Sequence, residues 1–240
     1  MPSVLGCAIV SGRAIAETKP SPEWLLQSTN KLATISPKIG GLPPMVMQAE
    51  RTKTYTAEEY LEQEVNSDER HEYINGEIIL KAGGTPNHNL IVGNLSATLY
   101  FSLKRQPYDV FALNQRLWIP EKRFYTYPDV MVVRGELQLQ EGRNDTLTNP
   151  ILIAEVLSKS TEGCDRGKKS QAYRSLPSLQ EYLFVDQYTM HVERYYRTEP
   201  NQWILSEYDK PESVIQFNSI PGEISLVDLY DKVDFQRDSE

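Results

Sequence analysis

The segment YPDVMVV spans residues 127–133, and the segment PILIAEVLS spans residues 150–158. Both are short apolar runs rich in β-branched residues, which is typical of buried strands. The first carries Asp129 and the second carries Glu155. A buried carboxylate is unfavourable unless a partner compensates its charge. We therefore expect two strands that lie close enough for their acids to share a hard cation.

The flanking sequence predicts further helices and strands. Thr56 and Glu59 have the spacing of a capping box, so a short helix is expected after Thr56. The pair Asn75-Gly76 marks a hairpin turn, and Thr85 with its following proline predicts the start of a long helix. Ser160 or Thr161 is expected to cap a later helix. The expected ranges are 86–105, 164–176 and 225–230 for the helices that follow the hairpin, and 108–119, 128–133, 151–157, 181–186, 190–197 and 202–209 for strands. Their order indicates an α/β (α+β) fold with a central mixed β-sheet flanked by helices.

The first fifty residues differ from the rest of the chain. Residues 1–50 are rich in Pro, Ser and Thr and show no sustained apolar period, which favours a disordered extension. An alternative is that translation starts at Met45 or Met47. The opening apolar stretch is short and has no basic region before it, so no export signal is expected. A single domain is expected over residues 53–234, with 235–240 as a tail.

Composition limits the classes of function. Hydrophobic residues make up 40% and charged residues 24% of the 240 residues, as in ordinary globular proteins. No run of about 18 apolar residues indicates a membrane helix. The net charge of −8 argues against a protein that coats nucleic acid, but a nuclease remains compatible because bound metal reverses the local charge. The two cysteines, Cys7 and Cys164, are too few for a disulfide framework or a thiolate zinc site, which favours the cytoplasm.

A third group of charged residues follows the two acids. Asp165 and the pair Lys168-Lys169 stand near the start of an expected helix. Two acids and a lysine are what a metal-dependent phosphodiesterase needs, because metal binds between the carboxylates and lysine orients water or neutralises phosphate. Mg²⁺ or Mn²⁺ would suit these ligands, and the Val156 carbonyl could add another. The alternative is that each acid alone is a capping or solvent-facing residue, and that the lysines form a solvated helix face.

Five segments together resemble a known family. They are ERHEYINGEI (69–78), TPNHN (85–89), YPDVMVV (127–133), IAEVLSKST (153–161) and DRGKKSQAY (165–173). This combination resembles the Uma family of "putative restriction endonucleases", which is counted with the PD-(D/E)XK nuclease superfamily. The resemblance covers residues 53–234. It implies a restriction-endonuclease-like core and metal-dependent cleavage of DNA, with the metal held by Asp129 and Glu155.

The position of the lysine departs from the general nuclease fold. That fold places a lysine two residues after the second acid, where this chain has Leu157. The family resembles this chain in placing the lysine on the next helix, in the pattern D-x-x-x-K-x-x-x-Y. Asp165, Lys169 and Tyr173 match it. A lysine stem is long and flexible enough to deliver its ammonium to the same point.

Four further residues are candidate auxiliaries. Glu72 and Glu77 match the early acidic positions of the family, where either would extend the metal site; a cross-strand charge pair on the hairpin is the alternative. His88 matches the family histidine near the long helix, where it would contact a phosphate or relay a proton; a helix-start contact is the alternative. Ser158 is expected to make a capping or supporting hydrogen bond rather than act as a nucleophile. The other two histidines, His71 and His191, are expected to be structural.

The sequence is compatible with three functions. The first is a magnesium-dependent endonuclease that cuts DNA. A homodimer is expected, because a symmetric pair of active sites cuts both strands. The second is a catalytically inactive module on the same fold that binds protein or nucleic acid. The third, a glycosidase with Glu155 and Asp129 as acid and base, is weaker because it needs an open sugar cleft with aromatic platforms.

Overall fold

The computed structural model describes residues 53–236 except residues 82 and 160. The extension expected at 1–50, with its alternative start at Met45 or Met47, and residues 237–240 of the expected tail lie outside the described residues. The described part of the chain contains the helices α1 (Ala57–Val65), α2 (Pro86–Ser102), α3 (Glu162–Cys164), α4 (Ser170–Arg174) and α5 (Leu226–Leu229). A π-helical turn, η3 (Asp165–Lys169), joins α3 to α4, and a 3₁₀ turn, η2, covers Pro120–Lys122.

The larger sheet has six strands in the order β11-β10-β9-β8-β6-β3. These strands are β3 (Tyr108–Ala112), β6 (Val130–Arg134), β8 (Pro150–Leu157), β9 (Glu181–Asp186), β10 (Val192–Glu199) and β11 (Gln202–Tyr208). Strands β8 and β9 pair in parallel, whereas the other neighbours pair antiparallel. The sheet is therefore mixed, and β8 lies in its interior with every residue buried.

A second sheet has five strands in the order β2-β1-β5-β4-β7. Its strands are β1 (His71–Ile74), β2 (Glu77–Leu80), β4 (Arg116–Ile119), β5 (Phe124–Thr126) and β7 (Thr146–Leu147). Strands β1 and β2 form the hairpin that Asn75-Gly76 predicts, and both turn residues have positive φ, as such two-residue turns require. A two-stranded ribbon of β12 (Val214–Gln216) and β13 (Glu223–Ser225) completes the described sheets.

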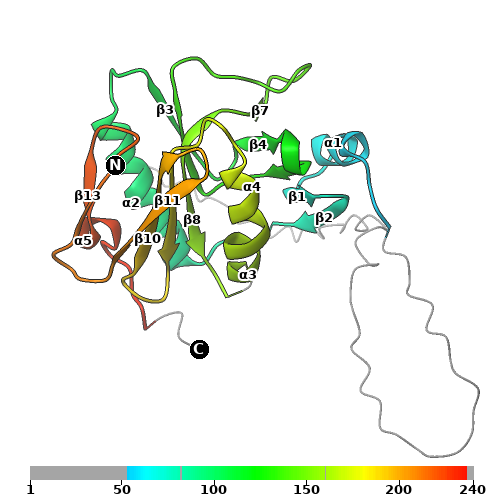
Figure 1. The fold of residues 1–240 in the computed structure, drawn as a ribbon. Helices are drawn as coiled ribbons and strands as arrows, with labels where there is room; N and C mark the ends of the chain where they lie inside the picture. The colour runs from blue at the N-terminus through cyan, green and yellow to red at the C-terminus, as the bar shows by residue number, and fades with distance from the viewer. Residues whose placement is uncertain (1–52, 82, 160, 237–240) are drawn as a thin grey trace, which may run out of the picture. The chain divides into compact units, whose positions relative to one another are not determined.

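Helices pack on both faces of the six-stranded sheet. Figure 1 shows α2 and α4 on opposite sides of this sheet. Along β8, Leu152, Ala154 and Val156 pack in the core with α2 and α5. The alternate residues Ile153 and Leu157 pack in the second core, which also contains residues of α4 and of the five-stranded sheet. This alternation follows from the period of two in a strand, and it fixes which face each acid occupies.

The local predictions are largely confirmed. Thr56 and Glu59 form the capping box of α1, and the Thr85 side chain caps α2 with Pro86 in its first turn. The expected α/β (α+β) class with a mixed sheet flanked by helices is confirmed, although a second sheet of five strands accompanies the central one. Among the residues that the structure covers, no helix combines the length and the apolar character needed to cross a membrane.

One expected strand was wrong, one expected cap is absent, and one ribbon was not predicted. The strand expected at 108–119 is two strands, β3 and β4, which belong to different sheets; Leu113 between them has φ of 59°, a left-handed conformation that interrupts an extended strand. Thr161 makes no side-chain cap, and Ser160, the other expected cap, lies outside the described residues. The Thr161 and Glu162 amides instead donate to the Ser158 carbonyl. The ribbon of β12 and β13 was not predicted, because its strands are only three residues long.

Candidate active site

The two acids lie opposite each other on neighbouring strands. Strands β6 and β8 pair antiparallel with Val130 opposite Ala154, so the same register continued by one residue sets Asp129 opposite Glu155. Asp129 immediately precedes β6, and Glu155 lies within β8. Glu155 lies between Ile153 and Leu157 in the alternating pattern. Its side chain therefore belongs to the face that carries α4 and the five-stranded sheet.

Main-chain hydrogen bonds tie each carboxylate to the other strand. The Val156 amide donates to Asp129 Oδ2 at 2.9 Å, and the Asp129 amide donates to Glu155 Oε2 at 3.4 Å. Asp129 is 4% exposed and Glu155 is 2% exposed. Like charges directly opposite on paired strands are destabilising, and burial increases this cost. The pair therefore needs cations close by.

Two cationic or polar side chains approach Asp129. His88 Nε2 lies 3.1 Å from Asp129 Oδ2, and Lys81 Nζ lies 3.2 Å from Asp129 Oδ1. His88 is in the first turn of α2, where its amide donates to the capping Thr85 hydroxyl. Burial alone would raise the pKa of Asp129, but the His88 hydrogen bond and the Lys81 charge lower it below its ordinary value. Asp129 is therefore ionised at neutral pH.

Lys169 is enclosed by three acids. Its Nζ lies 2.8 Å from Glu72 Oε1, 3.0 Å from Asp165 Oδ1 and 3.6 Å from Glu155 Oε1. Burial alone would lower the pKa of Lys169, but the charges of Glu155, Glu72 and Asp165 raise it well above its ordinary value. The lysine is therefore a fixed positive charge beside Glu155.

Glu155 has a further donor at Oε1, the oxygen that the Lys169 ammonium approaches. The Tyr173 hydroxyl donates to Glu155 Oε1 at 2.5 Å. Burial raises the pKa of Glu155 to about 8; the Asp129 and Asp165 charges add to this rise, and the Lys169 charge opposes it. Burial and the Glu155 charge together raise the pKa of Tyr173 well above its ordinary value, so the tyrosine keeps its proton and acts as a donor.

Leu157 occupies the strand position where the general nuclease fold has its lysine, and in this chain Lys169 approaches Glu155 from a helical turn instead. Leu157 follows Glu155 by two residues, so it lies on the same face of β8, where it is buried in the second core. Lys169 instead ends the π-helical turn η3. The lysine and Asp165 are four residues apart within this turn, and both therefore reach the acids from outside the sheet.

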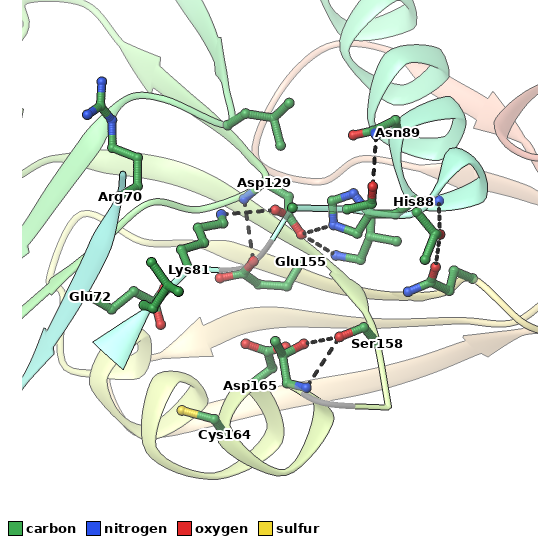
Figure 2. A pocket seen from close by; sticks show the side chains of 18 of the residues that line it. Arg70, Glu72, Lys81, His88, Asn89, Asp129, Glu155, Ser158, Cys164 and Asp165 are labelled. Atoms are coloured by element: carbon green, nitrogen blue, oxygen red, sulfur yellow. Dashed lines mark hydrogen bonds and ion pairs between the residues drawn. The ribbon is translucent and has the colours of Figure 1, made fainter. Parts of the chain in front are cut away.

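A pocket of about 860 Å³ opens at this point. Its walls include Asp129, Glu155, Glu72, Asp165 and Lys169. Figure 2 shows Lys81, His88 and Asn89 around Asp129, while Ser158, Cys164 and Asp165 lie on the opposite wall. Elements that are far apart in sequence thus meet at one cavity: the first hairpin, the start of α2, strands β6 and β8, and the turn η3.

The structure separates the candidate auxiliaries. Glu72 is buried, accepts from the Thr126 hydroxyl at 2.6 Å and pairs with Lys169. Glu77, on the other strand of the hairpin, is half exposed and lies 3.5 Å from Lys168; it is not among the residues of the pocket wall. Ser158 lines the pocket, and its hydroxyl lies 2.9 Å from the Thr161 hydroxyl. The Thr161 amide also donates to the Ser158 hydroxyl at 3.3 Å, so Ser158 makes local hydrogen bonds at this turn.

Three basic residues of the pocket wall were not predicted. They are Arg70, Lys81 and Lys159. Lys81 directly follows β2, the strand paired with the one that carries Glu72. The signal available in the sequence was that Lys81 lies close along the chain to the acids of the hairpin. This signal could not reveal that the Lys81 ammonium contacts the carboxylate of Asp129, which is 48 residues further along the chain.

A separate group of possible metal ligands lies on β10 and β11. His191 Nε2 is 3.8 Å from both Glu193 Oε1 and Glu207 Oε1. Among the described residues, the ligand atoms of these three side chains lie close enough together to hold one metal ion. Glu193 also binds Arg166 at 2.7 Å. His191, expected to be structural, thus has two acidic neighbours.

Comparisons with known proteins agree on one family. Residues 57–229 match the family model Uma2, described as "Putative restriction endonuclease". The uncharacterized protein sll1609 of Synechocystis sp. is 42% identical over 173 residues, covering 72% of this chain and 98% of that protein. The uncharacterized protein slr1290 of the same organism is 34% identical over 153 residues, covering 63% of this chain and 78% of that protein.

A solved structure shares the fold. It is described as a putative nuclease belonging to DUF820 from Anabaena variabilis, with a TM-score of 0.59 and 21% sequence identity. The alignment covers 73% of this chain and 97% of that one. With the family model matched over most of the described residues, the chain belongs to the Uma2 family, whose members are described as putative restriction endonucleases.

Proposed function

We propose that this protein is a metal-dependent endonuclease that hydrolyses DNA phosphodiester bonds. Membership of the Uma2 family and the putative nuclease with the same fold support nuclease-like chemistry. The observation that carries the proposal is the arrangement of three side chains. Asp129 and Glu155 lie opposite each other at one pocket, and the Lys169 ammonium lies 3.6 Å from Glu155 Oε1.

The chemistry of the donors fits a hard cation. Asp129 and Glu155 offer carboxylate oxygens, which Mg²⁺ or Mn²⁺ prefers, and the Val156 carbonyl is the main-chain ligand in this proposal. Asp129 Oδ1 accepts a positively charged group, the Lys81 ammonium, so a metal ion at this oxygen has to compete with that ammonium. A bound metal ion would lower the pKa of water and neutralise charge on the phosphate.

The protein side chains hold and orient the reacting groups. In this proposal the Lys169 ammonium orients the attacking water or neutralises a phosphate oxygen. Glu72 and Asp165 position Lys169 through their ion pairs at 2.8 Å and 3.0 Å. Tyr173 fixes Glu155 through its hydroxyl. His88 either holds the Asp129 carboxylate in place or contacts a phosphate. Its imidazole lies beside Asp129 in the pocket wall, where both roles are possible.

DNA binding in this proposal is local rather than spread over the surface. The net charge is −8, so most of the surface does not attract a polyanion. The pocket wall nevertheless includes Arg70, Lys81 and Lys159. These side chains offer positive charge beside the acids, where a scissile phosphate would enter.

Two substitutions that preserve size test the assignment. Asp129→Asn and Glu155→Gln are each expected to lower magnesium-dependent cleavage of plasmid DNA by at least about a hundredfold, because metal contributes several kcal/mol to such reactions. The matched control is Asp109→Asn, which changes an exposed acid on the edge strand β3 and should cleave at the normal rate. Circular dichroism checks that all three variants fold. Normal cleavage by both site variants would show that the assignment is wrong.

The second candidate function is a catalytically inactive module of the same fold that binds protein or nucleic acid. Two observations favour it: the net charge of −8, and the fact that the protein itself supplies a cation to each acid, Lys81 to Asp129 and Lys169 to Glu155. A calorimetric titration with Mg²⁺ distinguishes the functions. No binding at millimolar Mg²⁺ would leave only the inactive module.

A homodimer in the cytoplasm completes the proposal. Nucleases that cut both DNA strands often pair two active sites, and two-fold symmetry supplies such a pair. Sedimentation equilibrium with and without a DNA duplex tests this part independently of catalysis. A monomer under both conditions would contradict it.

A further inference from the structure

We propose that Lys81 is a built-in counter-cation that occupies the metal side of Asp129 in the metal-free protein and is displaced when a divalent metal ion binds. This inference rests on the proposed function, because it concerns the same pair of acids. It adds a residue that neither the expected motif nor the family pattern includes. It also gives Lys81 a role different from that of Lys169.

The contacts of Lys81 resemble those of a bound metal ion. Its Nζ donates to the Tyr127 carbonyl at 2.5 Å and to Asp129 Oδ1 at 3.2 Å. One ligand is a carboxylate and the other is a main-chain carbonyl, and hard divalent cations take both kinds of oxygen. Figure 2 shows the Lys81 ammonium directed at Asp129 across the pocket. The ammonium thus satisfies an oxygen that a metal ion would also use.

The position of Lys81 allows its ammonium to move away from Asp129. It follows β2, an edge strand of the five-stranded sheet, and its amide is held by the Arg70 carbonyl at 2.8 Å. The main chain is therefore fixed while the side chain, 22% exposed, lies in the pocket. Rotation about the flexible stem would move the ammonium away from Asp129 without a backbone change.

Lys169 does not share this freedom. Its side chain is 5% exposed and is within 3.6 Å of three acids. Lys81 pairs with one acid, so its release separates one ion pair rather than three. Of these two lysines, Lys81 is therefore the one that an incoming metal ion displaces, and Lys169 is the one that stays beside Glu155.

Charge makes the two cations compete. A divalent ion on Asp129 would lie within a few ångströms of the ammonium, and like charges at such separations repel each other strongly at the effective dielectric of a partly buried site. Metal binding thus requires Lys81 to move. The pocket of about 860 Å³ gives it room beside Arg70 and Lys159. The consequence is a metal affinity lower than the two carboxylates alone would give.

Binding of Mn²⁺ alone, without DNA, tests the inference. Electron paramagnetic resonance measures the free Mn²⁺ in titrations of the full chain and of three variants. Lys81→Met keeps the length of the side chain and removes the charge, so we expect Mn²⁺ to bind at least about tenfold more tightly. Lys81→Arg keeps the charge and should bind Mn²⁺ with the affinity of the wild-type protein. Lys168→Met removes an exposed lysine outside the pocket and should also leave the affinity unchanged.

The possible outcomes separate the two proposals. Equal Mn²⁺ affinity in Lys81→Met and the normal protein, with binding abolished by Asp129→Asn, overturns the role of Lys81 and keeps the metal site. No Mn²⁺ binding by either the normal protein or Lys81→Met overturns both proposals. Tighter binding in Lys81→Met and equally in Lys168→Met would be a general charge effect and would also overturn the role of Lys81. Thermal unfolding of each variant confirms that the fold is kept.

Discussion

Asp129 and Glu155 lie opposite each other on paired strands, and each carboxylate accepts a hydrogen bond from the main chain of the other strand. Two ionised acids in this position repel each other, and this repulsion adds to the effect of burial in raising the pKa of Glu155. The fold holds them together by bringing Lys81 and His88 to one and Lys169 to the other. The stability of the protein and the geometry of the acids therefore depend on these donors.

The contact between His88 and Asp129 depends on a glycine. A Cβ atom at Gly84 would lie 2.5 Å from His88 Nδ1 and 2.9 Å from its Cγ. Gly84→Ala should therefore push the imidazole away from Asp129 and lower DNA cleavage by about tenfold or more, since a positioned histidine contributes at least this much to proton transfer or charge stabilisation. A steady-state assay with Mg²⁺ measures the change.

The neighbouring glycine provides the control for this substitution. A Cβ atom at Gly83 would meet nothing within 4 Å, so Gly83→Ala changes the same loop without touching His88. It should cleave DNA at the normal rate. Equal activity in Gly84→Ala and Gly83→Ala would mean that the position of His88 does not matter for the reaction.

Lys169 should be important for stability as well as for activity. Removing its charge leaves Glu72, Asp165 and Glu155 buried close together without their shared cation. Breaking a buried ion pair in this way typically lowers the free energy of unfolding by about 3–5 kcal/mol, and we expect such a loss for Lys169→Met. Urea denaturation measures it.

The adjacent lysine shows whether this effect is local. Lys168 is exposed and pairs with Glu77 at 3.5 Å, so Lys168→Met should change the free energy of unfolding by no more than about 0.5 kcal/mol. A loss of the same size in both variants would show that the net charge of the segment matters, rather than the three acids around Lys169.

Tyr173 should act mainly on Glu155. Its hydroxyl donates to Glu155 Oε1, while its ring packs in the second core. Tyr173→Phe keeps the ring and removes the hydrogen bond, so we expect the free energy of unfolding to fall by about 1–3 kcal/mol, in the range for a buried group that loses its partner. We also expect slower cleavage, because Glu155 loses one of the contacts that fix its orientation. Normal stability and normal cleavage would contradict a role for this hydroxyl.

Much of the local structure follows from the sequence. The capping box at Thr56, the turn at Asn75-Gly76 and the cap at Thr85 depend on residues a few positions apart, and such signals are complete within a short window. The expected pairing of the strands that carry Asp129 and Glu155 is also confirmed. Apolar runs that each carry one acid indicate buried strands, and a buried acid needs a compensating partner.

The remaining features depend on contacts between distant segments. The break at Leu113 moves β4 into a second sheet. Asn114, a common turn residue, follows it directly, but a turn residue does not indicate a change of sheet. Lys81 reaches Asp129 only because the first hairpin stands beside the start of β6. Glu77 has the same residue type as Glu72 and lies on the paired strand, yet it faces Lys168 instead of the pocket. Spacing alone does not determine which acid of a hairpin turns inward.

A buried network away from the pocket predicts how stability depends on pH. Glu64 accepts from the His71 amide at 3.1 Å and from the Tyr127 hydroxyl at 2.8 Å, and His71 Nδ1 lies 3.0 Å from its carboxylate. Burial alone would raise the pKa of Glu64, but the hydrogen bonds from His71 and Tyr127 lower it below its ordinary value. Arg116 donates to the Tyr127 hydroxyl at 2.8 Å and extends the network.

The sign of the effect follows from this lowered pKa. The unfolded chain binds a proton at Glu64 near pH 4.3, whereas the folded protein binds it at lower pH. Ionised Glu64 therefore contributes stability above about pH 4.3, and this contribution is lost as the pH falls through the folded pKa. Glu64→Gln should be about 1–3 kcal/mol less stable at pH 7, with a smaller difference at pH 3. Urea denaturation from pH 7 to pH 3 measures it, with Glu62→Gln on the exposed side of α1 as the control. A difference that stays constant over this range would show that the charge of Glu64 does not contribute.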